Sequence, residues 1–144
     1  MTRNNRKPRR RGFTLVEVLL VLVILVIIAS LSVTVYSSVQ REANTDAARV
    51  AIQQFQKNLE LFHLHVNDYP TTAQGLEALM QPPPELASAG VWRGPYIRTV
   101  PLDPWRRPYQ YEYPGRHSPT EPDIWSLGND GQDGTDDDVC SWAQ

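Results

Sequence analysis

The sequence predicts an α+β protein in which a long N-terminal helix packs on a small antiparallel β-sheet head with an acidic C-terminal loop. Three features predict this fold class. An apolar run occupies 13–35, apolar residues continue at helical spacing to 66, and the remainder is rich in Pro, Gly and aromatic residues. Because 144 residues suffice for one modest domain, we expect a single head on a helical stalk.

Positive charge is concentrated at the N-terminus. Six of the 14 basic residues lie within the first eleven positions: Arg3, Arg6, Lys7, Arg9, Arg10 and Arg11. The rest of the chain has 8 basic residues against 16 acidic ones, and the basic cluster directly precedes the apolar run. This pattern is typical of a cytoplasmic flank that orients a membrane segment, and it disfavours nucleic-acid binding.

The apolar run 13–35 is 23 residues long and holds one ionisable residue, Glu17. A helix of this length can cross a bilayer. Because the run passes without a break into a polar helical pattern, we expect it to survive processing, unlike a secretory signal. An unpaired carboxylate costs about 2.5 kcal/mol at the centre of a span, so Glu17 either pairs with a cation or reaches the nearby interface.

The segment 11–17, RGFTLVE, resembles the processing site of type IV pilins and type II secretion pseudopilins. The resemblance implies that a prepilin peptidase removes the leader 1–12 by cutting between Gly12 and Phe13, and that Phe13 is then N-methylated. Glu17 becomes the fifth mature residue, where its carboxylate neutralises the new α-amine of an adjacent subunit. The chain departs from the family at Thr34, where many members have a helix-breaking proline, so a straighter helix is expected.

The segment 36–66 is predicted to be an amphipathic helix that follows the apolar one. Its apolar residues recur in steps of four and three and form one stripe: Ala48, Ile52, Phe55, Leu59, Phe62 and Val66. We expect this stripe to lie against the head. His63 and His65 are two positions apart and point to different faces, so they are predicted not to form a metal pair.

The remaining residues, 67–144, are predicted to form the head. A turn at 67–70 ends the long helix, and Thr71 with Gln74 reads as the capping box of a short helix through Met80, which the prolines 82–84 stop. Between Gly90 and Gly115 we expect short strands joined by tight turns. The alternation in 109–113, YQYEY, indicates the clearest strand, and 123–127, DIWSL, its antiparallel partner.

The acidic loop 127–138 holds five aspartates among three glycines. Carboxylates this close together repel one another unless a cation joins them, and oxygen ligands on a flexible turn favour calcium over zinc or magnesium. The spacing is not that of an EF-hand, because Ser141 stands where the closing Glu is needed. On composition alone a solvated acidic tail is an equal alternative. Cys140, the single cysteine, is expected to be a small buried apolar residue.

Several segments of the head, in order, are similar to the major pseudopilin of type II secretion systems, the general secretion pathway protein G family. They are DYPTT (68–72), QGLEAL (74–79), GPYI (94–97), DPW (103–105), YQY (109–111) and DIWSLGNDG (123–131). The resemblance implies one calcium ion in the loop 127–139. By position, the implied ligands are the side chains of Asp130, Asp137 and Asp138 and the carbonyls near Leu127 and Thr135, with Asp136 able to replace a neighbour.

The same resemblance implies a structural function without chemistry. The chain is expected to be the main subunit of a short periplasmic pseudopilus that grows from the inner membrane and pushes folded proteins through an outer-membrane channel. Implied partners are copies of itself, minor pseudopilins, the prepilin peptidase, an inner-membrane platform driven by a cytoplasmic ATPase, and membrane lipid before assembly. We expect one membrane pass, with the N-terminus cytoplasmic and the head periplasmic.

Two alternatives remain at this stage. The first is a type IV pilin or a minor pseudopilin, against which the segments 71–79 and 127–138 argue. The second is a membrane-anchored periplasmic enzyme. No Ser/His/Asp or Cys/His set at a recognisable spacing supports an enzyme, and the sole histidine of the head, His117, lies in a Pro-rich turn.

Overall fold

The computed structural model describes residues 12–142, apart from the side chains of 31–37. Its elements are the helix α1 (Leu15–Val66), the 3₁₀ helix η1 (Leu76–Leu79), the helix α2 (Pro84–Ala89) and the strands β1 (Gln110–Glu112), β2 (Asp123–Ser126) and β3 (Val139–Cys140). The chain divides into two compact units, Met1–Gln40 and Arg41–Gln144. The predicted fold class, a long N-terminal helix with a small antiparallel sheet, is confirmed.

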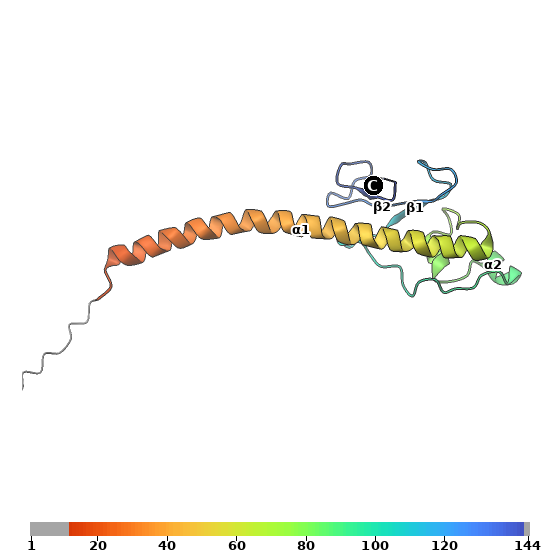
Figure 1. Ribbon diagram of the computed structural model, residues 1–144, viewed down its shortest axis with the longest axis horizontal. Helices are drawn as coiled ribbons and strands as arrows, with labels where there is room; N and C mark the ends of the chain where they lie inside the picture. The colour runs from red at the N-terminus through yellow and green to blue at the C-terminus, as the bar shows by residue number, and fades with distance from the viewer. Residues whose placement is uncertain (1–11, 143–144) are drawn as a thin grey trace, which may run out of the picture. The chain divides into compact units, whose positions relative to one another are not determined.

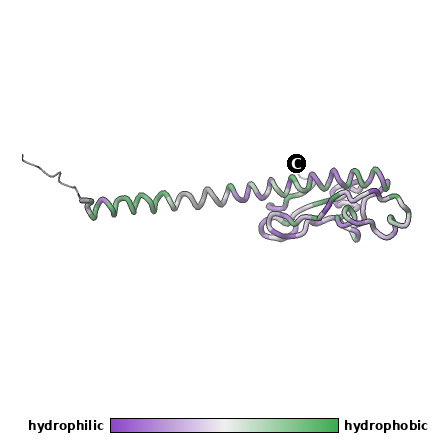
Figure 2. Tube along the Cα trace, turned by 90° about the horizontal axis from the view of Figure 1, so that it is seen from below, coloured by the Kyte–Doolittle hydropathy of each residue, from purple (hydrophilic) through white to green (hydrophobic). Residues whose placement is uncertain are grey.

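The first unit contains the apolar part of α1. The hydroxyl of Thr14 accepts a hydrogen bond of 3.3 Å from the backbone N–H of Glu17, so Thr14 caps the start of the helix. Figure 2 shows hydrophobic residues, in green, on the successive turns of α1 that follow its start. The large apolar side chains from Phe13 to Ile28 are 47–80% exposed. This unit therefore presents a continuous apolar surface.

Among the residues that the structure describes, we find no helix that is both long enough and apolar enough to cross a membrane. The predicted span 13–35 includes Thr34 and its neighbours, whose side chains lie outside the described part of the chain. The leader residues 1–11 also lie outside it.

The part of α1 in the second unit supplies one side of the hydrophobic core. The predicted stripe is buried: Ala48, Ile52, Phe55, Leu59 and Phe62 are each at most 3% exposed, and Val66 packs partly buried against the same cluster. The helix ends at Val66, and the next residue, Asn67, has a left-handed φ of 62° and donates its N–H to the carbonyl of His63 at 2.7 Å. Both the stripe and the end of the helix match the prediction.

The two histidines of α1 contact different parts of the head. His63 stacks on Tyr69 with 4.5 Å between ring centroids. The Nδ1 atom of His65 lies 2.9 Å from the hydroxyl of Tyr96. Both are interfacial residues that join the helix to the head.

The sheet has the order β1-β2-β3, and both pairings are antiparallel. Tyr111 lies opposite Ile124, and Ser126 lies opposite Val139. In Figure 1, β1 and β2 lie beside the second half of α1. Ile124 is fully buried in the core that includes the helix stripe, and Tyr109 packs edge-on against Phe55 with 5.2 Å between ring centroids. The predicted strand pair and its position on the stripe are confirmed.

The prediction of several strands between Gly90 and Gly115 is wrong. Within 90–115 only β1 is a strand, and the third strand of the sheet is the two-residue β3. Four prolines, at 95, 101, 104 and 108, precede β1 in this stretch, and proline has no N–H to donate to a ladder. A strand as short as β3 leaves no alternation to recognise, so the sequence did not indicate it.

The prediction for 71–84 also needs correction. The capping box forms, since Gln74 N–H donates to Thr71 Oγ1 at 3.3 Å and Thr71 N–H donates to Gln74 Oε1 at 3.0 Å. It closes a turn instead of starting an α-helix, because Gly75 leaves the helical region with a φ of 60° and is followed by the short η1. Pro84 does not stop a helix but begins α2, where a missing N–H costs nothing.

Replacing Arg106 by glycine is expected to stabilise the protein. Arg106 is exposed and has a φ of 67°, which costs a residue with a side chain about 1–2 kcal/mol. Glycine removes this strain but gives the unfolded chain more freedom, so we expect a net gain of about 0.5–1 kcal/mol, measured as a higher Tm. Arg98→Gly is the matched control, because Arg98 is exposed and lacks a positive φ. A Tm lowered equally by both changes would contradict the prediction.

Candidate functional site

The predicted processing site lies in extended chain just before α1. Gly12 and Phe13 precede the helix, and Phe13 is 79% exposed. A Cβ atom added to Gly12 would have no heavy atom within 4 Å, so the space beside this residue is open. The structure thus places both predicted residues on accessible backbone.

Glu17 occupies the first turn of α1. Its backbone N–H donates a hydrogen bond to the Thr14 hydroxyl. Glu17 is exposed, so its carboxylate is available to a second molecule. An acid in this turn also lies at the positive end of the helix dipole. Thr14 and Glu17 have the T-x-x-E spacing of a capping box, a signal that could have identified Thr14 as the cap from the sequence.

The acidic loop is a closed turn whose two arms contact each other. Gly128, Gly131 and Gly134 have φ values of 58°, 72° and 83°, conformations that favour glycine. A Cβ atom on Gly128 would collide with the carbonyl oxygen of Asp137. The first arm of the loop, residues 127–131, therefore passes directly against the second arm, which contains Asp137. The carbonyl of Leu127 accepts a hydrogen bond of 3.0 Å from Gly131 N–H, which folds the first arm.

Asp137 organises the loop through its own oxygens. Oδ2 accepts hydrogen bonds from the N–H groups of Asn129 at 2.7 Å and Asp130 at 3.0 Å, and Oδ1 accepts one from the Thr135 hydroxyl at 2.7 Å. The bond from Thr135 and those from the backbone lower the pKa of Asp137 below its ordinary value. Its stabilising effect is present above the ordinary aspartate pKa and is lost as pH falls through the lowered value.

Asp138 has one satisfied and one unsatisfied oxygen. Oδ2 accepts hydrogen bonds from Gly134 N–H at 2.7 Å and Thr135 N–H at 3.2 Å. Oδ1 is buried and has no hydrogen-bond partner. A buried carboxylate oxygen without a donor is unfavourable, and a bound cation would satisfy it.

The other predicted ligands are arranged around these two aspartates. Asp130 Oδ1 accepts a bond from Gln132 N–H at 2.8 Å and lies 3.4 Å from the Thr135 hydroxyl oxygen. Asp136 is exposed. In the described part of the chain, no three His, Cys, Asp or Glu side chains converge closely enough to form a metal site. A cation in this loop would therefore need backbone carbonyls among its ligands, and oxygen ligands are those that calcium prefers.

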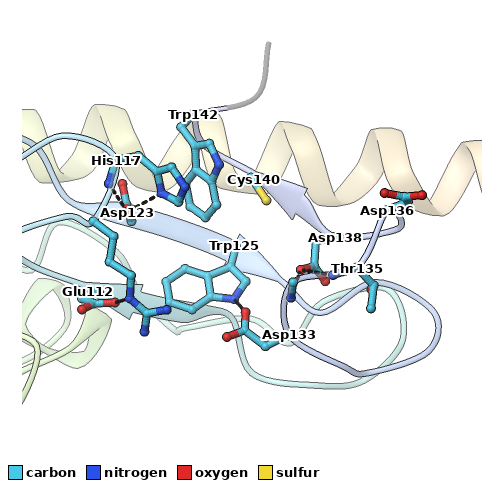
Figure 3. Close-up of a pocket in the computed structure, with 12 residues that line it drawn as sticks. Glu112, His117, Asp123, Trp125, Asp133, Thr135, Asp136, Asp138, Cys140 and Trp142 are labelled. Atoms are coloured by element: carbon cyan, nitrogen blue, oxygen red, sulfur yellow. Dashed lines mark hydrogen bonds and ion pairs between the residues drawn. The ribbon is translucent and has the colours of Figure 1, made fainter.

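A cleft of about 430 Å³ lies beside the loop and contains functional candidates that sequence reasoning missed. Figure 3 shows Trp125 donating from Nε1 to Asp133 Oδ1 at 2.8 Å, and His117 between Asp123 and Trp142. His117 Nδ1 lies 2.9 Å from Asp123 Oδ2, and its ring stacks on Trp142 with 3.9 Å between centroids. Asp133 thus supports a tryptophan, so it differs in role from the aspartates that follow it.

Cys140 also lines this cleft but is a poor nucleophile. Burial, together with the nearby Asp138, raises the pKa of its thiol to about 11. The thiol therefore remains protonated at neutral pH, and the thiolate is the reactive form. Cys140 was expected to be buried, but on β3 it is only half-buried.

Comparison with known proteins identifies two matching families. Residues 35–142 match the family described as type II secretion system (T2SS), protein G, and residues 7–33 match the prokaryotic N-terminal methylation motif. The chain is 42% identical over 138 residues to the type II secretion system core protein G of Aeromonas hydrophila, covering 95% of each chain. It is 37% identical over 141 residues to the protein of the same name from Pseudomonas aeruginosa, covering 95% of this chain and 98% of that one.

A solved structure shows the same fold. The match is the crystal structure of the major pseudopilin from the type 2 secretion system of enterohaemorrhagic Escherichia coli, with a TM-score of 0.58 and 34% sequence identity. The match covers 72% of this chain and 90% of that chain.

Proposed function

This chain belongs to the type II secretion system protein G family and is a structural subunit of a pseudopilus, and from this premise we propose that it polymerises through residues 13–35 after loss of residues 1–12. The observation that carries the proposal is the exposed apolar surface of α1, where side chains from Phe13 to Ile28 are 47–80% exposed. An apolar surface of this extent needs lipid or another apolar surface against it. Lipid covers it before assembly, and copies of the same helix cover it in the filament.

The direction of insertion follows from the basic cluster. Lys and Arg on the N-terminal side of an apolar segment keep that side in the cytoplasm. The head, residues 67–144, then lies in the periplasm, and the filament grows from the inner membrane. We propose that the prepilin peptidase, minor pseudopilins and an ATPase-driven inner-membrane platform act on the chain there, and that the chain itself carries out no chemistry.

Processing is the first test of this function. We expect the mature protein to begin with N-methylated Phe13, because the match to the N-terminal methylation motif covers 7–33 and the backbone at Gly12 is open. The measurement is N-terminal sequencing with intact mass of the protein from membranes. Protein from a host without the prepilin peptidase is the control and should keep Met1. A cut after Ala29 in the normal host would contradict the proposal.

We further propose that the loop 127–139 binds one calcium ion. The support is the buried Oδ1 of Asp138, which has no hydrogen-bond donor, and an oxygen-only set of neighbours. Asp130, Asp138 and the carbonyls of Leu127 and Thr135 would hold the ion. Asp136 and Asp137 are weaker candidates than Asp138, because Asp136 is exposed and both oxygens of Asp137 already accept hydrogen bonds within the loop. The ion would join the two arms of the loop and neutralise its carboxylates.

Chelation is expected to lower the Tm of the full chain in detergent. Calcium at one hundred times its Kd adds about 2.7 kcal/mol of stability, and for a head of this size that corresponds to about 10 °C or more. Asp138→Asn should remove most of the difference in Tm between calcium and chelator. Asp136→Asn, the same change on the exposed neighbour, should leave the difference intact. Equal melting of the unmodified protein with and without calcium would discard the calcium site.

A further inference from the structure

The guanidinium of Arg107 holds the first arm of the acidic loop, which we define as residues 127–131. Nη1 donates to the carbonyl of Gly128 at 2.6 Å, and Nη2 donates to the carbonyl of Asn129 at 3.2 Å. Two nitrogens of one rigid planar group thus bind two consecutive carbonyls. These bonds fix the orientation of both peptide units at the start of the loop.

The backbone of Arg107 is itself fixed by the core. The buried side chain of Asp103, 4% exposed, accepts the N–H of Arg107 at 2.7 Å, and Asp103 N–H donates to the carbonyl of Arg107 at 2.8 Å. The other oxygen of Asp103 accepts the Ser126 hydroxyl at 2.6 Å. Ser126 ends β2, immediately before the loop. Arg107 therefore joins the loop to a rigid part of the head.

Gly131 provides the space that the guanidinium needs. A Cβ atom on Gly131 would lie 2.5 Å from Arg107 Cζ, so only glycine permits this approach without displacing the guanidinium. Gly131 N–H in turn donates to the carbonyl of Leu127 at 3.0 Å. The guanidinium, the Gly131 backbone and the Leu127 carbonyl thus form one connected set of contacts.

We propose that Arg107 is a positioning residue that keeps the 127–131 arm folded without a metal ion and so prepares the loop for the calcium proposed above. The effect of Arg107 on calcium binding rests on the proposed calcium site. The effect of Arg107 on the folding of the 127–131 arm does not depend on that site. Two effects of the guanidinium on a cation oppose each other: ordering of the arm strengthens binding, and charge repulsion weakens it. With two direct hydrogen bonds to the arm, ordering dominates.

The test compares Arg107→Gln with Arg106→Gln in the full chain in detergent. Both changes remove one positive charge. Arg107 makes the hydrogen bonds to the loop, whereas Arg106 is exposed. Two measurements are made: hydrogen exchange of the amides of 127–131 in the presence of chelator, and calcium titration by calorimetry. Arg107→Lys is the third variant, because lysine keeps the charge but lacks the rigid pair of donors.

We expect Arg107→Gln to accelerate exchange in the 127–131 arm and to weaken calcium binding by about tenfold or more, as loss of outer contacts to a metal site commonly does. Arg106→Gln should change neither measurement, and Arg107→Lys should restore only part of each. Unchanged exchange in Arg107→Gln, or calcium binding that becomes tighter, would overturn the inference. If the unmodified protein binds no calcium, the calcium proposal fails and exchange alone decides the role of Arg107.

Discussion

Replacing Asp103 by alanine is expected to lower the free energy of unfolding by about 3–5 kcal/mol, the largest loss of stability we predict. The carboxylate accepts three hydrogen bonds: from Trp105 N–H at 3.0 Å, Arg107 N–H at 2.7 Å and the Ser126 hydroxyl at 2.6 Å. The Ser126 hydroxyl is buried and the two N–H donors are partly buried, and a buried donor left without an acceptor costs about 1–3 kcal/mol. Relaxation and entry of water reduce the sum, which gives the range above.

The measurement is chemical denaturation of the full chain followed by tryptophan fluorescence. Asp136→Ala is the matched control, because it removes the same group from an exposed position. Its effect should stay within about 0.5 kcal/mol, as for most surface changes. If Asp103→Ala lost no more stability than Asp136→Ala, the proposed support of the loop by the core would be wrong.

Replacing Glu17 by alanine or glutamine is expected to abolish filament assembly. We propose that the carboxylate of Glu17 pairs with the α-amine of Phe13 in an adjacent subunit. Its removal would then leave that amine without a partner in an apolar helix bundle, and loss of one member of a buried ion pair costs about 3–5 kcal/mol. At 1.4 kcal/mol per factor of ten, each addition of a subunit becomes at least about 100-fold less favourable. The head should be unaffected, because its whole core lies in the second unit.

Filament assembly and secretion are measured in cells. The Tm of the head is measured separately on the purified full chain in detergent. Glu42→Gln is the matched control, because it makes the same charge change at an exposed position of the polar half of α1. This variant should assemble normally. Normal filaments from Glu17→Gln would contradict the ion pair, and a lowered Tm of the head would point to misfolding instead.

Most of the fold could be predicted because its signals are local. The apolar stripe from Ala48 to Phe62 repeats at helical spacing, and alternation in 109–113 marked β1. Where the signal was ambiguous, prediction failed. The prolines before Tyr109 correctly indicated turns, but the strands expected between those turns are absent from 90–109. The strand β3 was missed because it has only two residues.

The acidic loop was predicted by composition, but its internal roles were not. Three consecutive aspartates look equivalent in the sequence, yet Asp137 accepts three hydrogen bonds, Asp138 has a buried oxygen without a partner, and Asp136 is exposed. Asp133, which counted as one more acid of the loop, supports Trp125. The difference arises from which side chains and amides the folded loop brings near each carboxylate.

Residue order alone thus determined the apolar helix, its amphipathic continuation, the strand pair and the acidic character of the loop, because these depend on neighbours along the chain. Only the tertiary structure assigned roles to Asp103 and Arg107. Arg107 binds a carbonyl 21 residues away, and Asp103 accepts a hydroxyl 23 residues away. Such contacts depend on the packing of the head, because packing sets which distant groups come within hydrogen-bonding distance.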